Sequence, residues 1–230
     1  MKIAFWGDSI TVGIPGASYF KILGKLLPHH ELINFARGGA SVIEAYEKIS
    51  NLKSSDTFDL AFVWIGTNDV FVKVSWTFPC FRWLMRQPWA KNVEEFRTYY
   101  SSILDNLHRR AKCVYAVSPW FVGEDVNNEW NVELEKLSTE VKVLSSTHKN
   151  INYLDMRKIF KSKLESKPIS NYVASSALGV ARDALILKSL EQVNQMSKNR
   201  GLHYTLDGVH LNEQGAEIVA RTFVEIIDKM

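Results

Sequence analysis

Short apolar runs alternate along the chain with longer stretches in which apolar residues recur every three or four positions. The short runs are rich in β-branched and aromatic residues, as is typical of buried strands: Ile3–Trp6, Glu31–Phe35, Leu60–Ile65, Val114–Val117 and Ile151–Leu154. The helical stripes include Phe20, Leu23 and Leu27; Val93, Phe96, Tyr100, Ile103, Leu104 and Leu107; Leu134, Leu137, Val141 and Leu144; and Val219, Phe223 and Ile226. Strands that alternate with helices predict βαβ units, and therefore a parallel sheet with helices on both faces. We expect residues 1–230 to form a single domain, a flavodoxin-like three-layer sandwich.

Two stretches, residues 70–92 and 161–206, are longer than this alternation requires, and we expect both to be insertions. The first contains three of the seven tryptophans and four basic residues, with no acidic residue. In the second, apolar positions recur with helical spacing from Tyr172 to Lys198, which predicts one additional helix.

Composition narrows the class of protein. The chain has 230 residues, is 46% hydrophobic and carries a formal charge of 28 − 25 = +3, which is ordinary for a globular protein and gives little reason to expect a nucleic-acid partner. Cys80 and Cys113 are too few for a disulfide framework, and we expect reduced thiols. The chain contains no signal-peptide core and no apolar run long enough to cross a membrane, so we expect a complete, soluble, cytoplasmic protein.

Polar residues that can do chemistry follow three of the predicted strands. Because ligands bind at the carboxyl ends of the strands in open α/β sheets, these positions carry the most information. They are Gly7-Asp8-Ser9, the stretch from Asn34 to Gly39, and Gly66-Thr67-Asn68-Asp69; Asp207-Gly208-Val209-His210-Leu211-Asn212 stands before the last predicted helix.

These residues supply the parts of a serine hydrolase. Ser9 is the candidate nucleophile, His210 the candidate general base, and Asp207 the acceptor that holds the imidazole in one tautomer. An oxyanion hole needs donors in place before charge develops, and the candidates are the backbone N–H groups of Ser9 and Gly39 and the side-chain amide of Asn68.

The four motifs resemble the blocks of the GDSL esterase/lipase family, also called SGNH hydrolases. GDSIT resembles the block that carries the nucleophile, GTND the block with the oxyanion asparagine, and DGVHLN the block with the aspartate and histidine. Asn34 and Gly39 match the spacing of the second block, and Ile10 replaces the family's leucine. The resemblance implies strand order 2-1-3-4-5 and hydrolysis of carboxylic esters through an acyl-enzyme on Ser9. It also leaves open carbohydrate O-deacetylase, thioesterase and acyltransferase activities.

Each motif also has a purely structural interpretation. Gly-Asp-Ser is also a common turn, Gly38-Gly39 a flexible loop and Asn212 the N-cap of the final helix; their joint occurrence in order favours catalysis. A non-catalytic sugar- or acyl-binding module on the same cleft is the alternative from another class. No HExxH, CxxC, GxGxxG or P-loop pattern occurs, so we expect neither metal nor cofactor, and a small ester as substrate.

Residues 70–92 have two interpretations. One is a packed element or a homo-oligomer contact; the other is an aromatic lid in which Trp76, Trp83 and Trp89 line an acyl or aryl pocket. The basic residues Lys73, Arg82, Arg86 and Lys91 would favour an anionic substrate or an anionic lipid surface. His203 lies close in sequence to the predicted base and is a candidate substrate-binding residue, although packed or exposed histidines are more common.

Overall fold

The computed structural model describes all 230 residues and contains one five-stranded parallel sheet in the order β2-β1-β3-β4-β5. The strands are β1 (Lys2–Gly7), β2 (Glu31–Asn34), β3 (Phe58–Trp64), β4 (Ala111–Val117) and β5 (Ile151–Leu154). The predicted fold class and strand order are therefore confirmed. All five predicted strands are present, and their ends differ from the prediction by three residues or fewer.

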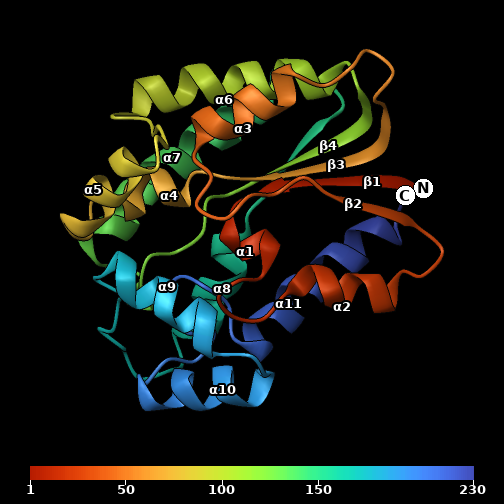
Figure 1. The fold of residues 1–230 in the computed structure, drawn as a ribbon. Helices are drawn as coiled ribbons and strands as arrows, with labels where there is room; N and C mark the ends of the chain where they lie inside the picture. Colours follow the sequence, from red (N-terminus) through yellow and green to blue (C-terminus); the bar gives the residue numbers. More distant parts are fainter.

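Helices cover both faces of the sheet (Figure 1). They are α1 (Ser9–Val12), α2 (Tyr19–Leu26), α3 (Val42–Ser50), α4 (Thr67–Phe71), α5 (Thr77–Leu84), α6 (Val93–His108), α7 (Glu129–Ser145), α8 (Met156–Leu164), α9 (Ala177–Ile186), α10 (Leu190–Asn199) and α11 (Glu213–Ile227). Helices α3, α6 and α7 pack on one face, and α2 and α11 pack together on the other. Both termini lie at the end of the sheet opposite α4 and α5, so the carboxyl ends of the strands point toward those two helices (Figure 1).

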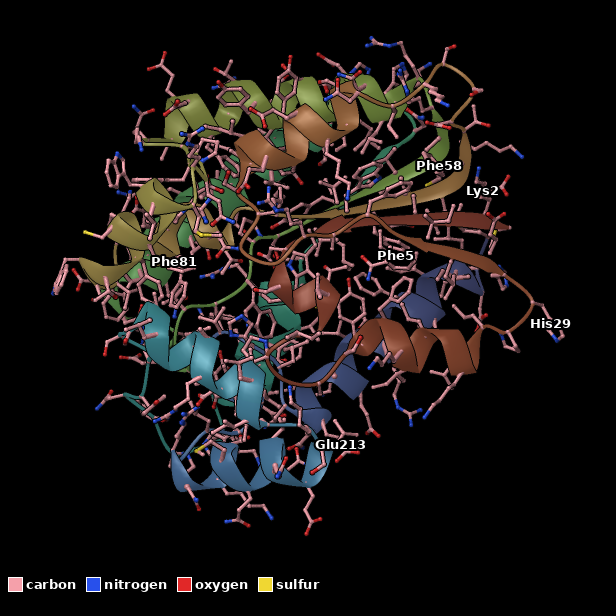
Figure 2. The ribbon with its side chains drawn as sticks, in the orientation of Figure 1. Lys2, Phe5, His29, Phe58, Phe81 and Glu213 are labelled. Carbon is pink, nitrogen blue, oxygen red and sulfur yellow. The ribbon has the colours of Figure 1, made fainter.

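Strands β1 and β3 are apolar on both faces because helices cover both faces of the sheet. Under the sheet, Phe223 of α11 packs against Phe5 and Phe62, with ring centroids 5.8 and 4.6 Å away. All three rings are almost completely buried, and Phe5 also stacks on Phe62 (Figure 2 labels Phe5 beside β1). Aromatic rings of this size bury much apolar surface, which fixes α11 against the centre of the sheet.

Polar side chains cap the N-termini of the helices that carry or support the candidate site. Ser41 and Glu44 form a capping box at the start of α3, in which each side chain accepts a hydrogen bond from the other residue's backbone N–H. Asn212 caps α11 by accepting from the N–H of Gly215, as predicted. These caps fix where the preceding loops end.

The predicted helix from Tyr172 to Lys198 is wrong, because two helices, α9 and α10, occupy the region and residues 172–176 form no regular secondary structure. The break falls at Leu187–Ser189, where Ser189 begins α10 in a capping box with Gln192. The apolar spacing continues through this break, so periodicity alone does not reveal it. Residues 70–92 contain α5 and an irregular stretch that leads into α6. The division of the chain into one domain with two insertions stays a prediction.

No helix combines the length and the apolar character that a membrane span requires. Cys80 and Cys113 are both unpaired.

Candidate active site

Ser9 lies in the turn where β1 leads into α1. A Cβ on Gly7 would lie 2.1 Å from the Thr11 hydroxyl oxygen, so the tight turn requires glycine at this position. The Asp8 carboxylate caps the N-terminus of α1 by accepting a hydrogen bond from the N–H of Ile10 at 2.9 Å. Because β1 and β3 are the two strands from which the chain departs in opposite directions, Ser9 stands at the switch point where α/β folds bind ligands.

His210 reaches Ser9 from the loop before α11, although the two residues are 201 positions apart in the sequence. The distance from His210 Nε2 to Ser9 Oγ is 2.9 Å, and the distance from His210 Nδ1 to Asp207 Oδ2 is 2.7 Å. The other carboxylate oxygen of Asp207 accepts from the backbone N–H groups of Val209 and His210, at 3.0 and 2.8 Å. The three candidate residues therefore form one continuous chain of hydrogen bonds.

Burial and charge shift the pKa values of Asp207 and His210 in opposite directions. Burial raises the pKa of Asp207, but the charge of His210 and the hydrogen bonds from its ring and backbone outweigh burial and hold the pKa below its usual value. Burial lowers the pKa of His210, but Asp207 outweighs this and leaves that pKa above its usual value. Because an ionised carboxylate only accepts hydrogen bonds, Asp207 places the imidazole proton on Nδ1. In neutral His210, Nε2 is then free to accept the proton of Ser9.

Asn68 lies in the first turn of α4, beyond the end of β3. Its Nδ2 group lines the same cavity as Ser9 and donates hydrogen bonds to Asp8 Oδ2 and to the carbonyl oxygen of Ala40, both at 3.1 Å. Burial raises the pKa of Asp8 to about 6, against hydrogen bonds that lower it. The amide of Asn68 is thus oriented by two acceptors at the edge of the cavity.

Gly39 lies on the loop between β2 and α3, in a left-handed conformation with φ of 73° that favours glycine. Asn34 orders the start of this loop, since its amide donates to the carbonyl oxygen of Thr11 and accepts from the N–H of Ala36. The structure brings Gly39, Asn68, Ser9 and His210 together around one cavity. These are four of the five residues predicted for catalysis or oxyanion binding, and the fifth, Asp207, stands behind His210.

Arg82 of α5 holds the Gly39 loop in place. Its guanidinium donates to the carbonyl oxygens of Gly39 and Pro88, at 2.6 and 2.7 Å, and pairs with Glu44 Oε2 at 3.1 Å. The side chain is 7% exposed, so Arg82 is a buried, paired cation and does not belong to the exposed charge predicted for residues 70–92. The sequence offers one signal for this role, a single arginine in an otherwise apolar stretch of helix.

Two buried carboxylates that sequence reasoning missed also order the loops of the site. Asp69 accepts from the N–H groups of Val42 and Ala90, which fixes α3 and the end of residues 70–92 to α4. Burial raises the pKa of Asp69 to about 6. Glu124 accepts from the backbone N–H groups of residues 203–205 and from the Thr205 hydroxyl, which anchors the loop that carries Asp207. An acidic residue beside an apolar run is the available signal for each.

The cavity above Ser9 has a volume of about 310 Å³ and a largely apolar wall. That wall is formed by Ile14, Pro15, Phe71, Val72, Phe78, Phe81, Met85, Ala177, Val180, Ala181 and Ala184, so α5 and α9 together enclose it. The predicted pocket tryptophans are not among these residues. Trp76, directly before α5, and Trp83, on its outer face, are 78 and 80% exposed, and half-buried Trp89 packs against Lys91. Helical geometry explains the difference, because the phenylalanines of α5 occupy its inner face.

His203 lies apart from Ser9. Its ring lines a separate polar cavity between α10 and α11 and contacts the carbonyl oxygen of Pro168 through Nε2 at 2.9 Å. The structure does not bring it into the cavity that contains Ser9. No group of three or more His, Cys, Asp or Glu side chains is placed to hold a metal ion.

Comparison with known proteins identifies the family. The sequence profile of the GDSL-like lipase/acylhydrolase family matches residues 3–223. The chain belongs to this family. It is therefore a carboxylic ester hydrolase of the serine esterase/lipase class, as the four motifs predicted. A comparison with curated protein sequences gives no match.

Solved structures share the fold of this GDSL hydrolase along nearly its whole length. The acetyl xylan esterase AlAXEase superposes with a TM-score of 0.64 at 19% identity, covering 99% of this chain and 100% of its own. A variant of Axe2, an acetyl-xylooligosaccharide esterase from Geobacillus, gives 0.68 at 17%, with 97 and 92% covered. A member of the lipolytic G-D-S-L family from Veillonella parvula gives 0.65 at 16%, with both chains fully covered. At this level of identity the likeness concerns the fold.

Proposed function

We propose that this GDSL hydrolase cleaves carboxylic esters through an acyl-enzyme on Ser9, with His210 as general base and Asp207 as the group that orients it. One observation carries the proposal: the hydrogen bonds from Ser9 Oγ to His210 and on to Asp207, at 2.9 and 2.7 Å, open on an apolar cavity. A buried nucleophile, base and orienting carboxylate in this order form the arrangement that activates a serine.

The reaction follows from the proton positions. Ser9 Oγ attacks the ester carbonyl carbon while His210 Nε2 takes the hydroxyl proton, and Asp207 stabilises the resulting imidazolium. The tetrahedral intermediate collapses, the carbon–oxygen bond to the alcohol breaks, and His210 returns the proton to the departing oxygen. Water then repeats the sequence on the acyl-enzyme, which releases the acid and restores Ser9.

The oxyanion of each intermediate needs donors that are fixed beforehand. We assign these to the backbone N–H groups of Ser9 and Gly39 and to Asn68 Nδ2, which lie around the same cavity. Both protons of the Asn68 amide have partners in the free enzyme, Asp8 and Ala40. The contact with Ala40 is the one that the oxyanion would replace, because the hydrogen bond to Asp8 keeps the amide oriented.

The chemistry of the cavity wall supports an uncharged acyl group as the bound portion of the substrate. Apart from Ser9, His210 and Asn68, the side chains on the wall that carry polar groups are Arg82 and Gln87, and Arg82 is already paired. A wall of this kind favours an acyl chain longer than acetyl. Deacetylation of a carbohydrate is the second candidate, since two of the solved structures with this fold are named as acetylxylan-type esterases.

Labelling with a fluorophosphonate tests the nucleophile. We expect a stoichiometric adduct on Ser9, and no adduct and no hydrolysis of p-nitrophenyl acetate in Ser9→Ala. The matched control is Ser170→Ala, a buried serine of similar exposure outside the cavity, which we expect to label and turn over like the wild type. An unlabelled wild-type protein would favour a non-catalytic binding module instead.

A panel of p-nitrophenyl esters from acetyl to dodecanoyl, with acetylated xylo-oligosaccharides and acyl thioesters, then separates the candidate substrates. We expect kcat/KM to rise from acetyl to a medium-length chain and then to fall once the chain exceeds the cavity. A maximum at acetyl together with turnover of the acetylated sugar would favour the deacetylase. Faster acyl transfer to an added alcohol than to water would favour a transferase.

A further inference from the structure

Two helices at the mouth of the cavity, α5 and α9, are apolar on their outer faces as well as on their inner faces. Trp83 and Leu84 on the outer face of α5, and Trp76 directly before the helix, are 70 to 80% exposed. On α9 the outer face carries Leu178 and Leu185, which are 78 and 70% exposed. We call these five residues the apolar rim. Helices at water-exposed surfaces ordinarily present polar residues outward, and exposed apolar residues near a cavity mouth are typical of interaction surfaces.

The two helices are in direct contact with each other. Helices α5 and α9 lie against each other at the end of the molecule toward which the strands point, far from both termini (Figure 1). The Thr77 hydroxyl links them, since it donates to the carbonyl oxygen of Ser175 and accepts from the N–H of Ala177. The two parts of the rim are therefore carried by helices that are joined directly.

The rim continues into the proposed active site. Phe81 and Met85 are 39 and 51% exposed at the surface, and both also line the cavity that contains Ser9 (Figure 2 labels Phe81 on α5). An acyl chain that leaves an apolar phase at the rim would reach Ser9 along a path lined by apolar side chains. A protein partner seated on the same face would close this path.

The charge of the segments that carry the rim indicates which kind of partner surface the rim would bind. Residues 70–92 and 166–190 carry six exposed basic side chains, Lys73, Arg86, Lys91, Lys167, Arg182 and Lys188. Lys73 pairs with Glu133 of α7, and the one acidic residue of these segments, buried Asp183, pairs with Arg200 at 2.7 Å and with Arg182 at 3.2 Å. Arg86, Lys91, Lys167 and Lys188 make no ion pair and supply the free positive charge of these segments. The rest of the chain is net negative, since these segments, with buried Arg82, account for +6 of the formal charge of +3.

We propose that the apolar rim docks this hydrolase on an anionic phospholipid bilayer and places the cavity mouth against the lipid. Tryptophan and leucine side chains suit the region between headgroups and acyl chains, and the surrounding lysines and arginines are attracted to anionic headgroups. The proposal rests on the proposed function in one respect, which is that the ester cleaved after docking would be carried by a lipid. Docking itself requires no turnover.

Vesicle co-sedimentation tests the docking. We expect the protein to bind vesicles of phosphatidylcholine mixed with phosphatidylglycerol and to bind pure phosphatidylcholine much less. Trp76→Ser/Trp83→Ser should lower the partition coefficient at least about tenfold, because both side chains lose their apolar contact with the lipid. The matched control, Leu26→Ser/Val143→Ser, removes exposed apolar side chains of α2 and α7 and should bind like the wild type.

Charge reversal provides the second arm. Each basic residue near an anionic surface contributes about fivefold to partitioning, so Arg86→Glu/Lys188→Glu should weaken binding about thirtyfold or more. Raising the salt concentration from about 0.1 M to about 1 M should also weaken binding of the wild type, since screening shortens the reach of these charges. All variants should hydrolyse a water-soluble acetyl ester like the wild type, which shows that they fold.

Three results would overturn the proposal. The first is equal binding to anionic and zwitterionic vesicles, and the second is wild-type binding by Trp76→Ser/Trp83→Ser. The third is a dimer in sedimentation equilibrium that this double variant abolishes, because it would assign the rim to a second copy of the chain. Since vesicle binding is measured without turnover, a failure here is distinct from a failure of Ser9 as the nucleophile.

Discussion

The Asp207→Asn substitution keeps the volume of the side chain and exchanges one carboxylate oxygen for an NH₂ group. The structure determines which one, because Asp207 Oδ1 accepts from the N–H groups of Val209 and His210. The amide oxygen of asparagine must stay at that position to satisfy both donors, and its NH₂ group then faces His210 Nδ1. That nitrogen becomes an acceptor, and the imidazole proton moves to Nε2.

His210 in this tautomer donates toward Ser9 and is unable to take its proton. Loss of the base in this way costs about 10⁴-fold in kcat where an aspartate holds a catalytic histidine. That factor corresponds to about 5.4 kcal/mol of activation free energy at 25 °C. We expect Asp207→Asn to lose about this much, and Ser9→Ala and His210→Ala to lose more, since those two groups take part directly in bond making.

The pH profile separates this explanation from simple loss of packing. The proposed mechanism requires neutral His210, so kcat/KM should rise with pH through the pKa of that residue, which Asp207 holds above its usual value. Removing the negative charge lowers this pKa, and the acid limb of the residual activity should therefore move to lower pH.

The assay is kcat/KM for p-nitrophenyl acetate between about pH 5 and pH 9, with circular dichroism to verify folding. Asp105→Asn is the matched control, because Asp105 contacts His148 at the same 2.7 Å on the surface, and it should leave kcat/KM unchanged. A folded Asp207→Asn protein within about tenfold of the wild type, or with its acid limb shifted to higher pH, would refute the reasoning.

Three further substitutions test other parts of the site. Asn68→Ala should lower kcat about 10²–10³-fold, and a change in KM alone would make Asn68 a substrate-binding residue. Ala184→Phe should shorten the cavity and lower kcat/KM for octanoyl more than for acetyl esters, by up to about 0.8 kcal/mol per excluded methylene; equal losses would contradict this. Asp69 has its folded-state pKa raised from 3.8 to about 6, so the folded protein binds the proton more tightly and the free energy of unfolding falls as pH rises from 4 to 6. Asp69→Asn should reduce that fall by about 2 kcal/mol in urea titrations, and an unchanged pH dependence would exclude Asp69 as its source.

Much of the architecture could be predicted from the sequence because it depends on local patterns. The runs that form β1 and β3 are continuous and apolar, as buried parallel strands require, and the motifs that follow them contain Ser9 and Asn68. The resemblance of four short motifs to one family supplied the strand order. In the structure those motifs meet at one end of the sheet, because parallel strands bring their carboxyl ends to the same edge.

The features that could not be predicted from the sequence depend on the direction in which a side chain points and on partners that are distant along the chain. Trp83 and Phe78 are five positions apart on α5 and face opposite sides of the helix, which composition does not distinguish. Arg82 reads as a surface charge until Glu44 and Gly39, about forty positions away, are placed beside it. The break between α9 and α10 was hidden for a related reason, since Ser189 caps a helix whose apolar period matches the helix before it.

The contact between Arg82 and the carbonyl oxygen of Gly39 joins two properties that protein engineers usually treat as separable. Helix α5 supplies part of the wall of the proposed acyl pocket, and the same helix supplies the arginine that holds Gly39, a proposed oxyanion donor, in place. A transplanted helix that suits a new substrate would therefore slow the reaction unless it also provides a donor to Gly39 and a partner for Glu44. Selectivity and rate would then vary together among variants of this segment, and natural or designed changes in residues 77–84 would succeed mainly where Arg82 is kept.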